Sequence, residues 1–381
     1  MIYLDNSATS DKKPYQVKKA VMEALNNPVN IGRSTGKNAF LYSRKIYEAR
    51  EEICDLIGGN EPQSVMFTLN ATAALNIALK GSLKNEKPHI VTTFTEHNSV
   101  LRQIYSHNNI EVSFLPCKDD YTADTDKLPE LIRDDTDLVV LNCASNVTGN
   151  MLDWQSAYNL IQADRKNPIP VLFDFSQAAG NIPINLYGMD YCMAAFSGHK
   201  SLLGPQGTGV LYVSPKLDLN TIAEGGTGSM STELIQPDFY PDRFESGTLN
   251  TPGIMGLYAG VKYVKKATVE NLREKKMRLA MLLYDRLKNM NGIKVYHDGN
   301  FDNKIPIVSF NVRDIYSDEI ASALNKKYGI CVRGGYHCAP FIHKIIGTEF
   351  QGAVRASIGY KTKKREILKL CDCVYKLSKE M

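Results

Sequence analysis

Short apolar segments rich in β-branched residues alternate with longer helical patterns along the first two thirds of the chain, and this alternation constrains the fold most. Six such segments are HIVTTFT (89–95), EVSFLP (111–116), DLVVLNCAS (137–145), VLFDFS (171–176), YCMAAFSG (191–198) and GTGVLYVS (207–214). Helical stretches lie between them, such as DWQSAYNLIQADRK (153–166), with an aspartate at its N-cap position. Apolar strands separated by helices indicate a largely parallel sheet that is covered on both faces.

The pattern changes near residue 255. A long amphipathic region (255–291) leads to IPIVSFNV (305–312), and a helical pattern lies near 317–327. The segments GICVRGG and AVRASIGY and a terminal helix follow. This order of helices and strands indicates a smaller α+β domain packed on the first one.

Composition excludes several classes of protein. The 381 residues carry a net charge of only +4, which gives no reason to expect nucleic-acid binding. No stretch approaches the ~20 apolar residues of a membrane span. The N-terminal MIYLDNSATSDKK lacks a basic region followed by an apolar run, so we expect no secretory signal and a cytoplasmic location. The eight dispersed cysteines are then expected to be free thiols.

Polar residues follow one predicted strand after another. They are His97, Asn146, Asp174, Gln177, Ser197, His199 and Lys200. Ligands of parallel sheets bind at the carboxyl ends of the strands, so we expect these side chains at one site. In FTLNATAALNIALK, Thr72 lies where a strand passes into a helix, which is a natural position for a bound phosphate.

These residue types suit pyridoxal 5′-phosphate. A lysine in a tight turn can form a Schiff base with the cofactor aldehyde, and a buried aspartate can keep the pyridine nitrogen protonated. Taken singly, each residue has an ordinary structural interpretation: Asp174 as a turn residue, Lys200 as a surface lysine, and His97 as a helix cap. Their occurrence in order, each at a predicted strand end, favours the cofactor site.

A glycine-rich segment, GICVRGGYHCAP (329–340), places Cys338 on a loop. The local residues leave two interpretations open, a buried free thiol or a nucleophile held on the loop. A metal site formed by His337, Cys338 and His343 is a weak alternative, because the paired spacing of known zinc sites is missing. We expect no metal centre.

Ten segments resemble, in order, the cysteine desulfurases and selenocysteine lyases, which belong to the class V aminotransferase group of fold-type I pyridoxal phosphate enzymes. They are YLDNSAT, NATAALNIAL, TEHNS, SNVTG, DFSQAAG, FSGHK, GPQGTGVLYV, FESGTLNTPGI, VRGGYHCAP and VRASIGY. The resemblance runs from residue 3 to about 360. It implies an α/β fold with a mostly parallel seven-stranded sheet in a large cofactor-binding domain (15–255). It also implies a smaller α+β domain (256–381 plus 1–14) that carries the Cys loop.

The resemblance also implies roles for the site residues. Lys200 matches the Schiff-base lysine that also moves the Cα proton, Cys338 matches the nucleophile, and His97 matches the histidine that stacks on the ring. Further cofactor contacts are implied for Asp174 at the pyridine nitrogen, Gln177 at the ring hydroxyl, and Thr72, Ala73, Ser197 and His199 on the phosphate side. Thr248 matches a phosphate contact from a neighbouring subunit, which implies a homodimer.

On the substrate side, Asn146 and Arg355 match the ligands of the substrate carboxylate, with Arg355 as a bidentate fork. Arg333 lies in the same region. Either it helps His337 to lower the pKa of the nucleophilic thiol, since only a thiolate attacks, or it anchors the loop. Three departures from the family pattern bear on substrate preference and sulfur delivery: Ala73 in place of glutamate, NSATS in place of NAATT, and Tyr336 in place of a second histidine.

The expected activity is that of a cysteine desulfurase, which converts L-cysteine to L-alanine and leaves a persulfide on Cys338. The sulfur would pass to an acceptor protein, for example one of iron–sulfur cluster assembly. Selenocysteine lyase activity on L-selenocysteine is an alternative. Another is a transaminase or lyase of the same fold, which would not need Cys338. A non-catalytic sulfur-trafficking partner is the alternative that the sequence favours least.

Overall fold

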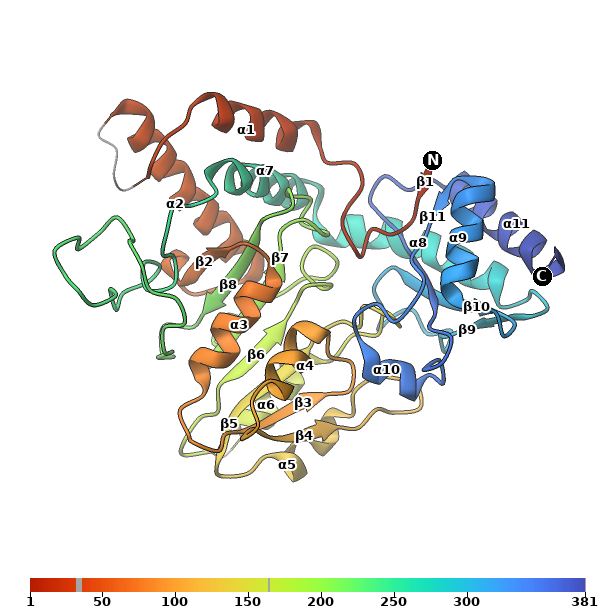
Figure 1. The fold of residues 1–381 in the computed structure, drawn as a ribbon, viewed down its shortest axis with the longest axis horizontal. Coiled ribbons are helices and arrows are strands. Elements are labelled where there is room, and N and C mark those ends of the chain that lie inside the picture. Colours follow the sequence, from red (N-terminus) through yellow and green to blue (C-terminus); the bar gives the residue numbers. More distant parts are fainter. Residues whose placement is uncertain (32–35, 164, 381) are drawn as a thin grey trace.

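The computed structural model describes residues 1–31, 36–163 and 165–380. A large part and a smaller part lie side by side (Figure 1). The N-terminal residues begin in the smaller part and then cross to the first helix of the larger one. Within the described residues, no helix has both the length and the apolar character needed to cross a membrane.

A seven-stranded sheet forms the centre of the large part, as the resemblance to fold-type I enzymes implies. Its strands, in spatial order, are β2 (Val65–Thr68), β8 (Gly209–Val213), β7 (Cys192–Ser197), β6 (Val171–Asp174), β5 (Thr136–Asn142), β3 (His89–Thr93) and β4 (Glu111–Leu115). β8 runs antiparallel to both β2 and β7, and the other pairs are parallel. All six predicted strands are confirmed to within two or three residues at their ends.

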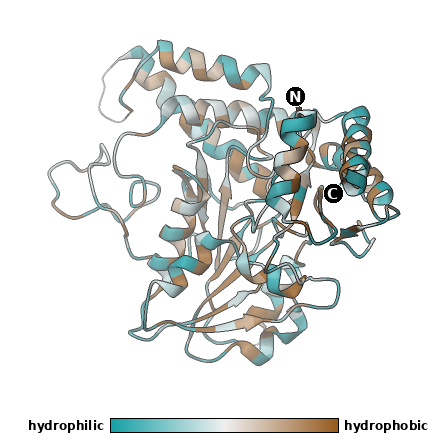
Figure 2. Ribbon diagram, turned by 45° about the vertical axis from the view of Figure 1, so that its right-hand side comes forward, coloured by the Kyte–Doolittle hydropathy of each residue, from teal (hydrophilic) through white to brown (hydrophobic). Residues whose placement is uncertain are grey.

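Helices cover both faces of this sheet, and the pattern of buried residues shows why. Along β5, Val139 and Leu141 join the core on one face, whereas Leu138 and Val140 join the core on the other. A strand whose successive side chains are all buried is stable only between two layers of helices. Figure 2 shows the hydrophobic strands between helices whose outer sides are hydrophilic.

The helices of the large part divide between the two cores. α3 (Ala71–Ser82) and α4 (Asn98–Tyr105) cover one face. The other core receives residues from α1 (Tyr15–Asn26), α2 (Lys37–Ile57), α5 (Leu128–Leu131), α6 (Trp154–Gln162) and α7 (Thr251–Ala267). The predicted cap of α6 is confirmed, because the Asp153 carboxylate accepts a hydrogen bond from the Ser156 amide. Residue 164 of the predicted helix lies outside the described residues.

The amphipathic region near 255–291 forms two helices and not one. α7 ends at Ala267 and α8 (Val269–Leu287) begins after Thr268, whose φ of 58° lies in the left-handed region and breaks the helical path. α7 contributes Leu257 to the core under the large sheet, and α8 contributes Leu283 to the core of the small part. A division of the chain into domains near residue 255 stays a prediction.

The small part has two sheets packed with helices. β9 (Ile293–Val295), β10 (Ile307–Val312) and β12 (Val354–Ser357) form an antiparallel sheet, while β1 (Ile2–Tyr3) pairs in parallel with β11 (Ile330–Cys331). The remaining helices are α9 (Ser317–Tyr328), α10 (Pro340–Ile345) and α11 (Lys364–Glu380). Cys371 and Cys373 of α11 are buried in this core, and all eight cysteines of the chain are free thiols.

Candidate active site

A cavity of about 220 Å³ opens at the carboxyl ends of the central parallel strands, where the sequence predicts a site. Ten of the predicted site residues line it: Thr72, His97, Asn146, Asp174, Gln177, Ser197, His199, Lys200, Arg333 and Arg355. Ala73, Thr248 and Cys338 do not line it. The strand order therefore gathers residues that are up to 283 positions apart (355 − 72).

Asp174 is the last residue of β6 and lies buried at the base of the cavity. Its Oδ1 accepts a 2.8 Å hydrogen bond from the Ser176 amide, which fixes the orientation of the carboxylate. Gln177 lies one turn further on, and its side-chain amide donates to the backbone carbonyl of Ser7 at 3.1 Å. The N-terminal segment thus forms part of the wall of the cavity.

Lys200 follows β7 in a turn and points its amine into the same cavity. Burial lowers the pKa of Lys200 to about 8, although the Asp174 charge opposes this change. A large fraction of the amine is therefore neutral near pH 8. A neutral amine is the form that adds to a carbonyl group.

His97 is the N-cap of α4, and its Nδ1 accepts a 3.0 Å hydrogen bond from the Ser99 amide. Burial lowers the pKa of His97 to about 4, so the ring is neutral at physiological pH. The ordinary reading of His97 as a helix cap and the functional reading as a cavity residue therefore hold together. A neutral planar ring held at its cap position is suited to stacking on an aromatic ligand.

The N-terminus of α3 borders the other end of the cavity. The Asn70 side chain caps this helix by accepting a hydrogen bond from the Ala73 amide at 2.9 Å, so Ala73 contributes only its backbone here. The Thr72 and Ser99 hydroxyls lie 2.7 Å apart. Ser197, at the end of β7, adds a buried hydroxyl. Hydroxyl groups beside a helix N-terminus form a phosphate-binding arrangement.

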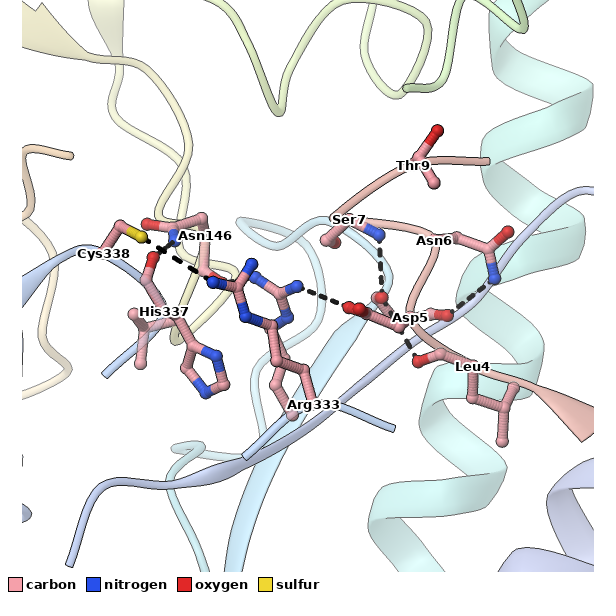
Figure 3. A network of polar contacts seen from close by, with 12 residues as sticks. Leu4, Asp5, Asn6, Ser7, Thr9, Asn146, Arg333, His337 and Cys338 are labelled. Carbon is pink, nitrogen blue, oxygen red and sulfur yellow. Dashed lines mark hydrogen bonds and ion pairs between the residues drawn. The ribbon is translucent and has the colours of Figure 1, made fainter. Parts of the chain in front are cut away.

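Arg355 lies on β12 at the opposite side of the cavity and is only 1% exposed. Its Nη1 donates to the backbone carbonyl of Asn146 at 3.0 Å, and its Nη2 donates to the Asp5 carboxylate at 2.6 Å. The Asn146 side-chain amide donates to the carbonyl of His337 at 2.6 Å. Figure 3 shows this network between the N-terminal segment and the Cys loop.

Cys338 is exposed on the loop that follows Gly335. The Arg333 guanidinium, which lines the cavity, donates to the Cys338 sulfur with a separation of 3.7 Å (Figure 3). His337 and Cys338 both have positive φ, 51° and 59°, so the loop turns sharply at the thiol. The interpretation of Cys338 as a buried packing residue is therefore wrong.

His337 is not a cationic neighbour of the thiol. Its ring is buried and its Nε2 bonds to the Ala353 carbonyl at 2.9 Å. Burial and the Arg355 charge lower the pKa of His337 well below its usual range, so the ring carries no positive charge near pH 7. The cation in contact with the sulfur is Arg333. Within the described residues, no three acidic, histidine or cysteine side chains are grouped to hold a metal ion.

The sequence profile of the family described as Aminotransferase class-V matches residues 2–370. The chain belongs to this family. Enzymes of the class-V aminotransferase family that are cysteine desulfurases depend on pyridoxal 5′-phosphate, so the chain is identified as a pyridoxal phosphate enzyme. The mixed α/β fold with its seven-stranded sheet is the fold-type I architecture.

Several proteins named cysteine desulfurase are similar to this chain over most of their length. A probable cysteine desulfurase of Methanothermobacter thermautotrophicus is 29% identical, over 96% of this chain and 92% of that protein. A cysteine desulfurase of Haloferax volcanii is also 29% identical, over 98% of this chain and 88% of its own. The solved apo cysteine desulfurase of Thermococcus onnurineus superposes with a TM-score of 0.89 at 27% identity, covering 100% of this chain and 95% of that one.

The residues of this class-V aminotransferase fit the cofactor. Four buried polar atoms of cavity residues have no hydrogen-bond partner within the described part of the chain: Asn146 Oδ1, His199 Nδ1, His337 Nδ1 and Arg355 Nε. Buried polar atoms are normally paired, so these atoms indicate a polar ligand. Burial also lowers the pKa of His199 to about 4, which leaves its ring neutral. The Asp174 carboxylate, the Lys200 amine and the phosphate-binding arrangement at the N-terminus of α3 are the other groups that pyridoxal phosphate needs.

Two acidic side chains that lie beside cavity residues, Asp5 and Glu96, were not assigned by the sequence. Asp5 lies in YLDNSAT, a segment that carries the resemblance, but nothing local shows that it contacts Arg355. Glu96, next to His97, is fully buried, and burial together with the Asp174 charge raises its pKa to about 8. A glutamate inside TEHNS looks like a surface residue in the sequence. In the structure it is buried after β3, where its Oε1 accepts hydrogen bonds from the Thr93 hydroxyl at 2.9 Å and the Asn142 amide at 2.8 Å.

Proposed function

We propose that this class-V aminotransferase is a cysteine desulfurase that converts L-cysteine to L-alanine and leaves the sulfur as a persulfide on Cys338. The observation that carries the proposal is the exposed Cys338 sulfur bound to Arg333, a residue that also lines the Lys200 cavity. A nucleophilic thiol needs accessibility and a nearby cation, and Cys338 has both. The similar proteins named cysteine desulfurase support the same activity.

The substrate carboxylate would bind at Arg355 and Asn146. Arg355 retains guanidinium donors beyond those used by Asp5 and by the Asn146 carbonyl. Lys200 would hold the cofactor aldehyde and, once the substrate amine takes its place, remove the Cα proton with its Nζ. Asp174 would face the pyridine nitrogen, and the neutral His97 ring would cover the cofactor face. When bound, pyridoxal phosphate supplies an electron sink that makes the Cα proton and the Cβ–S bond labile.

The sulfur transfer needs no reactant besides L-cysteine and the Cys338 thiol. The Cys338 thiolate attacks the substrate sulfur, an S–S bond forms, and the Cβ–S bond breaks with its electron pair passing to the substrate carbon skeleton. Protonation of that skeleton gives alanine, and the enzyme retains the sulfur as Cys338–S–SH. The Arg333 cation stabilises the negative charge on sulfur through the contact described above.

A homodimer is part of this proposal. Thr248 is exposed and lies outside the cavity of its own chain. Part of the segment before it, 221–238, projects from the body of the molecule (Figure 1) and exposes Leu234 and Ile235. Exposed apolar side chains on a projecting segment suit an interface between subunits. Thr248 would then reach the phosphate side of a neighbouring subunit's cavity.

We further propose a cytoplasmic enzyme that passes its sulfur to an acceptor protein, for example a scaffold for iron–sulfur clusters. The eight free cysteines support a reducing compartment. Two exposed aromatic side chains lie together near the exposed Cys338: Tyr336 of the same loop and Phe350, whose backbone carbonyl is 3.5 Å from the Tyr336 hydroxyl. Exposed aromatic side chains beside the sulfur suit contact with a protein partner.

The test is peptide mass spectrometry of the cofactor-loaded protein after incubation with L-cysteine, with alanine assayed in the same tube. We expect one added sulfur on the Cys338 peptide and stoichiometric alanine. Cys338→Ser should abolish the adduct and lower alanine formation by about a hundredfold or more, since the residue acts in the chemical step. Cys331→Ser, seven positions upstream and half-buried, is the matched control. Formation of alanine without the adduct would contradict the persulfide. The absence of both alanine and the adduct would contradict the desulfurase.

A further inference from the structure

The N-terminal segment brings a carboxylate to the substrate side of the cavity. Asp5 Oδ1 accepts a 2.6 Å hydrogen bond from Arg355 Nη2, and the two side chains are 15% and 1% exposed. Such a pair is largely shielded from water, so its attraction is stronger than that of a surface ion pair. The similarity to cysteine desulfurases assigns a role to Arg355 and none to Asp5.

The backbone on both sides of Asp5 is fixed by the small part. The Leu4 amide donates to the Cys331 carbonyl at 2.8 Å, and the Ser357 amide donates to the Leu4 carbonyl at 2.7 Å. On the other side, Asn6 Nδ2 donates to the Ser357 carbonyl at 3.0 Å. Asp5 therefore approaches Arg355 from a fixed position, and its carboxylate can set the orientation of the guanidinium group.

Arg355 keeps donors free in this arrangement. A guanidinium group has five N–H bonds, and Asp5 and the Asn146 carbonyl each accept one of them. Its Nε, although buried, has no partner within the described part of the chain. A guanidinium that one carboxylate holds on one side, with donors left on the cavity side, is prepared to bind a second carboxylate.

Asp5 also balances two like charges. Arg333 and Arg355 lie opposite each other in an antiparallel bridge, with backbone hydrogen bonds of 3.2 and 2.7 Å, and both line the cavity. Burial and the Arg333 charge lower the pKa of Arg355, and Asp5 opposes this change. Without Asp5, a buried guanidinium would lose its only carboxylate partner among the described residues.

We propose that Asp5 is a positioning residue for the α-carboxylate of the amino-acid substrate: it orients the Arg355 guanidinium and neutralises part of its charge while leaving donors free toward the cavity. The inference rests on the proposed function and adds to it a residue that acts through Arg355. It predicts that loss of the Asp5 carboxylate weakens the binding of the substrate carboxylate selectively.

The test compares the affinities of L-alanine and of ethylamine, which lacks the carboxylate, by calorimetry on the cofactor-loaded protein. Asp5→Asn should weaken L-alanine binding about ten- to hundredfold, as expected for loss of a charged hydrogen bond, and leave ethylamine unchanged. Asp11→Asn is the control, because Asp11 is exposed on the same segment. In an Arg355→Ala background, Asp5→Asn should change L-alanine affinity by less than about twofold.

Three results would overturn the proposal: unchanged L-alanine affinity in Asp5→Asn, equal weakening of both ligands, or a full additional loss in the Arg355→Ala background. If Asp5→Asn does not fold, as judged by its melting curve, Asp5→Glu takes its place in the same binding measurements. Its longer side chain displaces the guanidinium, so L-alanine should bind several-fold more weakly with ethylamine unchanged, and wild-type affinity for L-alanine would overturn the proposal.

The two proposals fail separately. Wild-type protein that forms no alanine from L-cysteine, but shows the selective loss in Asp5→Asn, would contradict the desulfurase and support the role of Asp5. Alanine formation together with unchanged ligand binding in Asp5→Asn would do the reverse.

Discussion

The side-chain amide of Asn146 donates a 2.6 Å hydrogen bond to the backbone carbonyl of His337, the residue before Cys338. A second bond, from the Asn98 amide to the Cys338 carbonyl at 2.7 Å, joins the same loop to the start of α4. These two bonds connect the Cys loop of the small part to the strand ends of the large part. Asn146, which would bind the substrate carboxylate, therefore also holds the loop that carries the proposed nucleophile, Cys338.

Asn146→Ala removes the hydrogen bond from the Asn146 side chain to the His337 carbonyl. We expect amide hydrogen exchange in residues 334–340 to speed up by about tenfold, because a local opening then breaks one hydrogen bond fewer. L-cysteine turnover should fall by at least the same factor. Asn289→Ala, whose exposed side chain caps the end of α8, is the control and should match the wild type in both measurements. Unaltered exchange in Asn146→Ala would show that the bond does not hold the loop.

The pKa of Lys200, lowered to about 8, sets a pH dependence for cofactor attachment. Only the neutral amine reacts with the aldehyde, so the attachment rate of cofactor-free protein should rise with pH and level off above about pH 8. An ordinary lysine would continue to gain reactivity up to its usual pKa of 10.5. Stopped-flow absorbance from pH 6 to 10 measures this.

Lys13 also has a pKa lowered to about 8 by burial and lies against the His199 carbonyl at 2.8 Å, so it needs a control. Lys13→Arg should retain the wild-type pH profile, whereas Lys200→Ala should show no covalent attachment at any pH. A midpoint near pH 10 in the wild type would refute the shift at Lys200.

Arg50 and Glu245 form a buried ion pair with two parallel hydrogen bonds of 2.7 and 2.6 Å. Arg50→Ala leaves the Glu245 charge buried without its partner and should lower the free energy of unfolding by about 3–5 kcal/mol. Arg44 on the same helix pairs with Glu48 but is 72% exposed, so Arg44→Ala should change stability by less than about 0.5 kcal/mol. Denaturant titrations of both variants decide this, and equal small losses would contradict it.

Glu96 should make stability depend on pH. Its folded-state pKa of about 8 lies above the usual 4.5, so between these values the folded protein holds a proton that the unfolded chain has released. The free energy of unfolding therefore falls as pH rises through that window. The Glu96→Gln side chain does not titrate. Its free energy of unfolding relative to that of the wild type should therefore rise by a few kcal/mol, an order-of-magnitude value, between pH 5 and 8.

The comparison needs denaturant titrations of both proteins at pH 5, 6.5 and 8. Glu51→Gln, an exposed glutamate of α2, should show no change in relative stability with pH. A constant difference between Glu96→Gln and wild type across this range would mean that Glu96 is ionised in the folded protein.

The strands and most cavity residues were predictable because they depend on local patterns. A strand buried on both faces is apolar at every position, and polar residues placed after it lie at the edge of the sheet. The antiparallel direction of β8 was not predictable, because its neighbours bury it as completely as a parallel strand. The break at Thr268 was equally hidden, since neither glycine nor proline marks it and the amphipathic pattern continues across it.

The contact between Asp5 and Arg355 was beyond sequence reasoning for a different reason. The two residues are 350 positions apart, and they meet only because β1 pairs with β11 and Asp5 bridges to Ser357. Glu96 shows the same limit, since its carboxylate is buried against the amide of Asn142, 46 positions away on β5. For Cys338, the glycines before it predicted a loop, but its exposure follows from two consecutive positive φ angles.

The pairing of the first strand with β11 also affects how the protein is made. A ribosome synthesises Asp5 350 positions before Arg355, and chains are synthesised at roughly 5–20 residues per second. The proposed site for the substrate carboxylate therefore cannot exist on a nascent chain until Arg355 has emerged. Prematurely terminated products that lack β12 retain Lys200 but lack Arg355, the proposed ligand of the substrate carboxylate. Under the proposed function, a chain without β12 would therefore release no sulfur from L-cysteine.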